Sequence, residues 1–338
     1  MRAALVTQYG PWRDLRVGNL AEPVAGDDEL LLEVEASEVN FPDILHVEGR
    51  YQVKVPLPFA PGLGGVGRVL SAGSAVGDFT VGQRVLALPV HGMHAERVAV
   101  KADHCFAVPD DVPSDIAAAL GLVYQTSWFG LFARADFRPA DRVLVLGASG
   151  GIGMATIQLA RALGARQVIA ATRGAEGARV ARELGADAVV DTAAPDLRDS
   201  LRAHVLELTD GHGADVVIDP VGGPVAEAAL RAMAWEGRYV VIGFAAGDIP
   251  SFRANYLLVK NISVSGLQWT DYRKRDLARV RDAQERIFGL WREGRLKPRI
   301  SSKLPLSRIH DAFEALEQGA ARGKIVLVPD RLWDGGTA

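Results

Sequence analysis

The sequence lacks the features of a disulfide-stabilised, secreted or nucleic-acid-binding protein. Cys105 is the only cysteine among 338 residues, which excludes an intrachain disulfide framework and a four-cysteine zinc site, and suits a reducing cytosol. The formal net charge is only −3, so no basic surface is expected to attract nucleic acid or anionic membrane. No signal peptide is recognised at the N-terminus, and we expect no apolar segment of the roughly 20 residues that span a bilayer. These absences predict a cytoplasmic protein that binds neither membrane nor nucleic acid.

The patterns that are present change character near Pro113. Before it, many short β-branched runs are separated by Gly, Pro and Asp, which predicts a small β-barrel. From Arg142 onward, near-continuous apolar strands alternate with helical segments, which predicts a doubly wound parallel sheet buried on both faces. Residues 271–294 predict one long helix, whose interleaved acidic and basic residues indicate a solvated face.

The stretch VLVLGASGGIGMATIQLARALGA, residues 143–165, contains two overlapping motifs. Residues 147–151 fit G-x-S-x-G, in which Ser149 would be the nucleophile of a hydrolase. Residues 148–153 nearly fit G-x-G-x-x-G, which binds a dinucleotide pyrophosphate at a helix N-terminus, although Ala148 replaces the first glycine. The run of βα units after the loop favours the cofactor motif. A hydrolase would need an oxyanion-hole loop upstream, which is not evident, and a base, for which the candidates are His204, His212 and His310.

The residues after this loop predict which cofactor is bound. The pyrophosphate ligands are expected to be Ser149, Gly150, Gly151, Ile152 and Gly153. The next strand ends at Thr172 and Arg173, with no carboxylate before Glu176. NAD enzymes place an acidic residue on the ribose 2′-OH about 20 residues after the loop, whereas a hydroxyl and a guanidinium would bind a 2′-phosphate. We therefore predict NADPH rather than NADH.

Six segments resemble the medium-chain dehydrogenase/reductase superfamily, in its zinc-free quinone oxidoreductase branch related to zeta-crystallin. They are VNFPDILHVEGRY, PFAPGLGGVGRV, GSAVGDFTVGQRVLAL, GASGGIGMATIQLARALGA, GRYVVIGFAAG and GKIVLV, and the likeness covers nearly the whole chain. The resemblance implies an α/β fold with two domains and the cofactor in the cleft between them. A GroES-like β-barrel catalytic domain would comprise residues 1–121 and 268–338, and an inserted Rossmann NADPH-binding domain residues 122–267. It also implies a homodimer formed through the strand ISVSGLQW.

The same resemblance implies roles for individual residues. Asn40 and Thr126 match positions near the nicotinamide, and Tyr51 matches a tyrosine of the substrate cleft, so these three are the expected catalytic residues. The further expected cofactor contacts are Gly243 and Phe244, in the loop over the nicotinamide ring, and Lys324, near the C-terminus. Asp43 and His46, close to Asn40 in sequence, are expected to be solvated loop residues.

Several positions depart from related enzymes. Zinc-dependent members carry a cysteine at the position of Asn40 and G-H-E at residues 62–64, so their zinc-binding side chains are missing here. His91 and His94 could not form a zinc site by themselves, because no third ligand is evident. No metal is therefore expected. Bacterial quinone oxidoreductases often place a lysine where Gly177 stands and a tyrosine where Thr192 stands, so Arg173 must carry more of the NADPH preference. Leu45 replaces another cleft tyrosine and makes the substrate pocket more apolar.

These features predict hydride transfer from NADPH to a quinone. A zinc-free site lacks the Lewis acid that alcohol oxidation uses, whereas quinones and enones delocalise the incoming charge themselves. An alternative from the same branch is reduction of an activated C=C bond in an enone or enoyl thioester. A third reading, from another class, is a cofactor-binding protein with a structural or RNA-binding role, against which the acidic charge balance argues.

Overall fold

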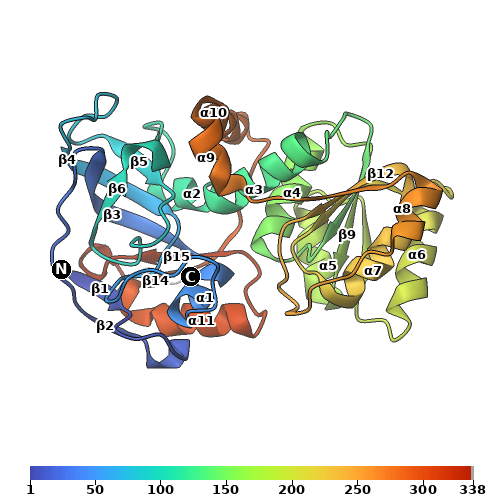
Figure 1. The fold of residues 1–338 in the computed structure, drawn as a ribbon, viewed down its shortest axis with the longest axis horizontal. Coiled ribbons are helices and arrows are strands. Elements are labelled where there is room, and N and C mark those ends of the chain that lie inside the picture. The colour runs from blue at the N-terminus through green and yellow to red at the C-terminus, as the bar shows by residue number, and fades with distance from the viewer. Residues whose placement is uncertain (336–338) are drawn as a thin grey trace. The chain divides into compact units, whose positions relative to one another are not determined.

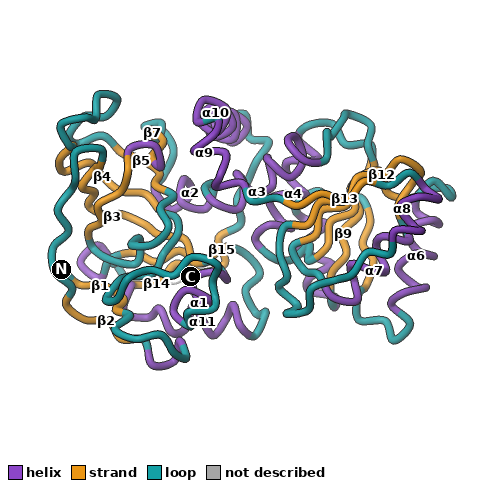
Figure 2. The backbone as a smooth tube through the Cα atoms, in the orientation of Figure 1, coloured by secondary structure: helices purple, strands orange, loops and turns teal. Residues whose placement is uncertain are grey.

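The computed structural model describes residues 1–335, which form two compact units (Figures 1 and 2). Unit 1 comprises Met1–Leu122, Asp276–Phe288 and the described residues from Pro298 onward, and unit 2 comprises Val123–Arg275 and Gly289–Lys297. The first boundary lies one residue after the expected one. The chain leaves unit 2 after Arg275 rather than after residue 267, and Gly289–Lys297, which were expected in the barrel domain, also belong to unit 2. The later exit has a packing cause, because the ring of Tyr272 lies 4.6 Å from that of Phe129.

Unit 1 is built on antiparallel strands from both ends of the chain. Its main sheet has the order β14-β15-β3-β4-β5-β7, with β6 also paired to β3, and β1 and β2 form a separate ribbon. The pairing of β15 with β3 ties the C-terminal part of the unit to its N-terminal part. The strands are β1 (Arg2–Leu5), β2 (Arg16–Asn19), β3 (Glu29–Val39), β4 (Gly65–Ala72), β5 (Arg84–Ala87), β6 (Arg97–Lys101), β7 (Cys105–Ala107), β14 (Ile300–Pro305) and β15 (Lys324–Val328). The predicted GroES-like fold is confirmed.

Short helices complete unit 1. They are α1 (Phe41–Val47), α2 (Ser114–Ala119), α11 (Ile309–Glu317) and the 3-10 turns Trp12–Asp14, Ala102–His104, Leu306–Arg308 and Asp330–Leu332. The helix expected over residues 271–294 is interrupted, since α9 (Tyr272–Arg275) ends before α10 (Leu277–Arg292) begins. The interruption lies at Asp276, whose carboxylate accepts a hydrogen bond from the backbone N–H of Arg279 at 3.1 Å and so caps α10.

Unit 2 contains a six-stranded parallel sheet in the order β10-β9-β8-β11-β12-β13. The strands are β8 (Arg142–Leu146), β9 (Gln167–Thr172), β10 (Ala188–Asp191), β11 (Ala214–Asp219), β12 (Met233–Val241) and β13 (Ser263–Gly266). The central strands are buried on both faces, as their unbroken apolar runs predict; in β8, for example, Val143 to Leu146 are fully buried.

Helices flank this sheet on both sides. Figure 1 shows α4 on one side and α6, α7 and α8 on the other. The helices are α3 (Leu122–Phe129), followed by a π-helical turn (Gly130–Arg134), α4 (Gly151–Ala162), α5 (Gly174–Glu183), α6 (Leu197–Leu208), α7 (Gly223–Arg231) and α8 (Ala254–Lys260). The predicted Rossmann architecture is confirmed, and its carboxyl edge is where such folds bind nucleotides.

One segment corrects an expectation drawn from the sequence. Ser114–Arg134 is long and apolar enough to cross a membrane by length and composition, although no such segment was expected. Its most apolar window is 72% buried within the protein, and the core helix of a soluble protein meets the same criterion. The segment is also divided among α2, α3 and the π-helical turn. It is therefore weak support for a membrane span.

Candidate functional site

The glycine loop turns directly from β8 into α4. Gly147 adopts φ +59°, a left-handed conformation that glycine tolerates at little cost. The backbone N–H of Gly150 donates to the carbonyl of Gly147 at 2.9 Å and closes the turn, and Gly150 is the N-cap of α4. The first amides of a helix have no intrahelical acceptors and lie at the positive end of the helix dipole. The loop therefore fits a pyrophosphate.

Gly153 allows α4 to pack closely on the loop. A Cβ atom added to Gly153 would lie 2.4 Å from the carbonyl oxygen of Gly147 and 2.6 Å from the Cα of Ala148. Ala148 itself is fully buried, and its N–H donates to the carbonyl of Ala171 in β9 at 3.1 Å. The alanine that replaces the first glycine of the fingerprint is thus accommodated inside the fold.

Ser149 lies beside a threonine rather than beside a catalytic base. The hydroxyl of Thr172 donates to Ser149 Oγ at 3.0 Å. His212 is instead paired with Asp215 at 2.7 Å, and the ring of His310 lies 6.2 Å from that of Trp12 in unit 1. The geometry favours the cofactor motif over the hydrolase motif.

The end of β9 offers hydroxyl groups and a cation. Arg173 is exposed and forms the N-cap of α5. Glu176 is held by Arg179, whose Nε donates to it at 2.9 Å. A Cβ atom at Gly177 would lie 2.6 Å from the hydroxyl of Thr172, so a larger residue there would displace that hydroxyl. The arrangement fits a ribose 2′-phosphate at Thr172 and Arg173, as the sequence predicts.

Thr126 lies on α3, which is fastened to the start of α4. Thr126 is buried. The neighbouring Ser127 donates its hydroxyl to the carbonyl of Ile152 at 3.2 Å, and Thr156 Oγ1 lies 3.0 Å from Ser127 Oγ. These contacts hold α3 at the first turn of the helix that follows the glycine loop.

Asp219, at the end of β11, was not singled out from the sequence. It is fully buried, and its carboxylate accepts from Tyr239 Oη at 2.7 Å and from the amides of Val221 and Gly222 at 2.8 and 2.9 Å. Its carbonyl oxygen accepts from the N–H of Gly243 at 3.3 Å. Burial raises the pKa of Asp219. Asp219 therefore organises two loops at the carboxyl edge, including the one that carries Gly243 and the half-exposed Phe244.

In unit 1, Asn40 and Lys324 are in direct contact. Lys324 Nζ donates to Asn40 Oδ1 at 2.5 Å and to the carbonyl of Val39 at 3.2 Å, and forms an ion pair with Glu38 Oε2 at 2.7 Å. All three side chains are more than nine-tenths buried. Glu38 was missed, because a glutamate inside an alternating strand predicts only a solvent-facing residue.

Asp43 and His46 are buried, which corrects the expectation that they are solvated loop residues. Both lie on α1, with exposed fractions of 0% and 2%. Asp43 Oδ2 accepts from the N–H of Asn40 at 2.7 Å and lies 3.4 Å from Nε2 of the buried His94, whose Nδ1 is 3.0 Å from Ser37 Oγ. The carboxylate of Asp43 therefore fixes the backbone that positions Asn40.

His46 and Tyr51 form an aromatic pair with ring centroids 4.3 Å apart. Burial lowers the pKa of His46, partly offset by Asp43, while nearby His91 lowers it further. Burial also raises the pKa of Tyr51. At neutral pH the imidazole is therefore neutral, and the Tyr51 hydroxyl keeps its proton and can donate a hydrogen bond.

We expect His46 to make the protein less stable in mild acid. Its pKa is depressed in the folded state, so the unfolded chain takes up protons first as the pH falls below about 6.5, and stability is lost across that range. His46→Leu should therefore reduce the fall in Tm between pH 7.5 and 5.5. The exposed His204, replaced by Gln, should leave that fall unchanged, and an equal fall in His46→Leu would contradict the prediction.

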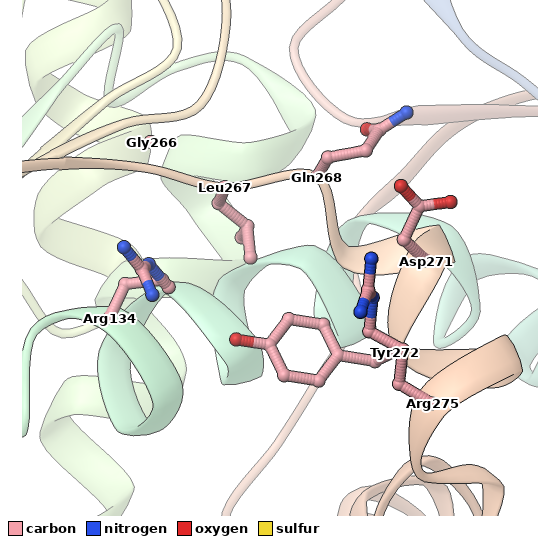
Figure 3. Close-up of a pocket in the computed structure, with 7 residues that line it drawn as sticks. All are labelled: Arg134, Gly266, Leu267, Gln268, Asp271, Tyr272 and Arg275. Carbon is pink, nitrogen blue, oxygen red and sulfur yellow. The ribbon is translucent and has the colours of Figure 1, made fainter.

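A pocket of about 340 Å³ opens at the end of β13 in unit 2 (Figure 3). It is lined by Arg134, Gly266, Leu267, Gln268, Asp271, Tyr272 and Arg275. Figure 3 shows the Tyr272 hydroxyl pointing toward Arg134. The pocket therefore presents two guanidinium groups and one carboxylate. In residues 1–335, no group of three or more His, Cys, Asp or Glu side chains is arranged to hold a metal ion.

Comparisons with known proteins agree with this geometry. Residues 151–283 match the family model described as zinc-binding dehydrogenase, and residues 26–111 match the alcohol dehydrogenase GroES-like domain. The quinone oxidoreductase-like protein 2 homolog of Nematostella vectensis is 36% identical over 89% of this chain and 82% of that protein. The synaptic vesicle membrane protein VAT-1 homolog of Mus musculus is 30% identical over 97% and 84%. The solved structure of mycobacterial Rv1454c complexed with NADPH matches with a TM-score of 0.90 at 30% identity, over 97% of this chain and all of that chain.

Proposed function

We propose that the hydride acceptor of this protein is a quinone. The chain belongs to the medium-chain dehydrogenase/reductase superfamily and is an NADPH-dependent oxidoreductase of its quinone oxidoreductase-like group. The observation that carries the proposal is that unit 1 holds two neutral donors at positions that the resemblance assigns to the reaction. The Asn40 amide stands where zinc-dependent relatives carry a cysteine, and the protonated Tyr51 hydroxyl stands where the family has a tyrosine of the substrate cleft. Neutral donors suit an acceptor whose ring spreads the incoming charge.

The chain's own residues have separate tasks in this proposal. The amides of residues 150–153 bind the pyrophosphate, and Thr172 and Arg173 bind the 2′-phosphate. NADPH supplies the hydride when bound. Asn40 and Tyr51 donate hydrogen bonds to the quinone oxygen that becomes negatively charged, which stabilises the transition state. The remaining proton comes from water.

A turnover screen tests this proposal. We expect NADPH oxidation with 1,4-benzoquinone to have a higher kcat/KM than with an enone or a coenzyme A enoyl ester. Metal content should be measured on the same sample, and added EDTA should leave the rate unchanged. Faster turnover of an enone or a thioester would replace the quinone as the substrate, and no turnover of any acceptor would favour a binding protein.

We expect Arg173→Ala to reduce the preference for NADPH. One charge-assisted hydrogen bond contributes about 1.5–3 kcal/mol, so the ratio of NADPH to NADH affinity should fall by roughly ten- to a hundredfold. Fluorescence titration of both nucleotides measures this ratio. Arg182→Ala removes another exposed arginine of α5 and is the matched control. An unchanged ratio in Arg173→Ala would exclude Arg173 from 2′-phosphate binding.

The pocket in Figure 3 supports a second candidate, reduction of an enoyl thioester. Arg134 and Arg275 line it. Guanidinium groups bind phosphates well, and coenzyme A carries several phosphates. Under this alternative, Arg134→Ala with Arg275→Ala should raise KM for a coenzyme A ester and leave KM for a quinone unchanged.

We also propose a homodimer formed through β13, in a reducing cytoplasm that suits the buried Cys105. In the described part of the chain, β13 is an edge strand of its sheet. The helix before it exposes Leu258 and Val259, at 79% and 76%. Leu258→Glu with Val259→Glu should lower the molar mass measured by light scattering to that of one chain, whereas Val81→Glu, at another exposed valine, should not.

A further inference from the structure

The amide of Asn40 has a chemically defined orientation. An ammonium group has three donors and no acceptor, so it can face only the oxygen of an asparagine side chain. Lys324 Nζ lies 2.5 Å from Asn40 Oδ1, and its other contacts are Glu38 Oε2 and the carbonyl of Val39. Asn40 Nδ2 is 3.5 Å from the carbonyl of Glu38, at the limit of a hydrogen bond. The strong donors of the Asn40 amide therefore remain for another acceptor.

The ion pair that holds this orientation is costly. Glu38 is fully buried and Lys324 is 6% exposed. Replacing a buried ion pair by uncharged groups of similar volume is often neutral or stabilising, so stability alone does not account for it. Glu38 is itself held by the N–H of Leu122, which donates to Oε1 at 2.9 Å.

We propose that Lys324, held by Glu38, is a positioning residue that fixes and polarises the Asn40 amide, so that Nδ2 is presented as a hydrogen-bond donor to the reacting oxygen of the acceptor. This differs from the direct cofactor contact that the sequence resemblance implies for Lys324. Contact with a cation withdraws electron density from Oδ1 and makes the Nδ2 protons stronger donors. The inference rests on the role of Asn40 in the proposed function.

Coupling between variants tests the inference. Lys324→Met with Glu38→Gln removes the charges without leaving one of them buried alone. Compared with wild type, kcat of this double variant should fall at least tenfold. Its KM for the quinone and its NADPH dissociation constant, measured by fluorescence without acceptor, should stay within about threefold of the wild-type values. The single substitution Lys324→Arg keeps a cation beside Glu38, so its kcat should be higher than that of the double variant.

Asn40→Ala provides the second arm of the cycle. It removes the donor itself, so kcat should fall by about a hundredfold. Adding the Lys324 and Glu38 substitutions to Asn40→Ala should lower kcat by less than a further threefold. Losses that multiply, or a loss confined to NADPH affinity, would overturn the inference and assign Lys324 to the cofactor or to general stability.

A spectroscopic measurement keeps this test independent of the substrate. The chain contains four asparagines, so protein labelled with ¹⁵N-asparagine gives few side-chain NH₂ signals. Asn40 is assigned by the signal lost in Asn40→Ala. Lys324→Met with Glu38→Gln should shift that signal, and Lys324→Arg should restore it. If no acceptor is turned over, the proposed function fails, whereas an unshifted Asn40 signal overturns this inference alone.

Discussion

Gly153→Ala is expected to reduce NADPH affinity at least tenfold and to lower stability by about 1–3 kcal/mol. The added Cβ would meet the Gly147 carbonyl oxygen at 2.4 Å and the Ala148 Cα at 2.6 Å. Both are backbone atoms, so no side-chain rotation can relieve the overlap. The start of α4 must move away from β8, and the amides that bind the pyrophosphate move with it. Fluorescence titration with NADPH and thermal unfolding measure the two effects.

Gly289→Ala is the matched control for this substitution. Gly289 also lies within a helix, but a Cβ atom there would have no heavy atom within 4 Å. The change should leave NADPH affinity unaltered and raise stability by roughly 0.5–1 kcal/mol, because alanine loses less backbone entropy in a helix. NADPH affinity within twofold of wild type in Gly153→Ala would contradict the close packing of α4 on the loop.

The nucleotide-binding unit could be predicted because its signals are local in sequence. Apolar strands alternating with helices determine a parallel sheet, and the glycine loop lies next to the strand and helix that it joins. The assignment of Thr172 and Arg173 to the 2′-phosphate stays a prediction, and it too uses only residues at the end of one strand. Asp219 of this unit was missed. An aspartate that ends an apolar strand is a detectable signal, but the partner Tyr239 lies 20 residues further along the chain.

The polar cluster of unit 1 could be predicted only in part, because its contacts join distant segments. Asn40 and Lys324 are 284 residues apart, and Ser37 and His94 are 57 residues apart. The pairing of β15 with β3 brings Lys324 beside Asn40. The resemblance supplied Asn40 and Lys324 separately, but not their contact. A sequence also cannot distinguish a buried carboxylate from a solvated one, which is why Asp43 was misjudged.

Asp219→Ala is expected to be among the most destabilising single substitutions in unit 2. It would leave the buried Tyr239 hydroxyl and the amides of Val221 and Gly222 without their acceptor. Each buried polar group that loses its partner costs about 1–3 kcal/mol, so we expect a loss of at least about 3 kcal/mol, roughly 6–12 °C in Tm. NADPH affinity should fall as well, because the loop at Gly243 also depends on Asp219.

Asp219→Asn separates hydrogen bonding from charge at this position. The amide oxygen can still accept from Val221 and Gly222, and burial already disfavours the charge, since it raises the pKa of Asp219. The asparagine variant should therefore lose no more than about 1 kcal/mol. Tyr239→Phe leaves the buried Oδ2 of Asp219 without its donor and should cost about 1–3 kcal/mol. A loss in Asp219→Asn equal to that in Asp219→Ala would contradict this prediction and show that the negative charge is required.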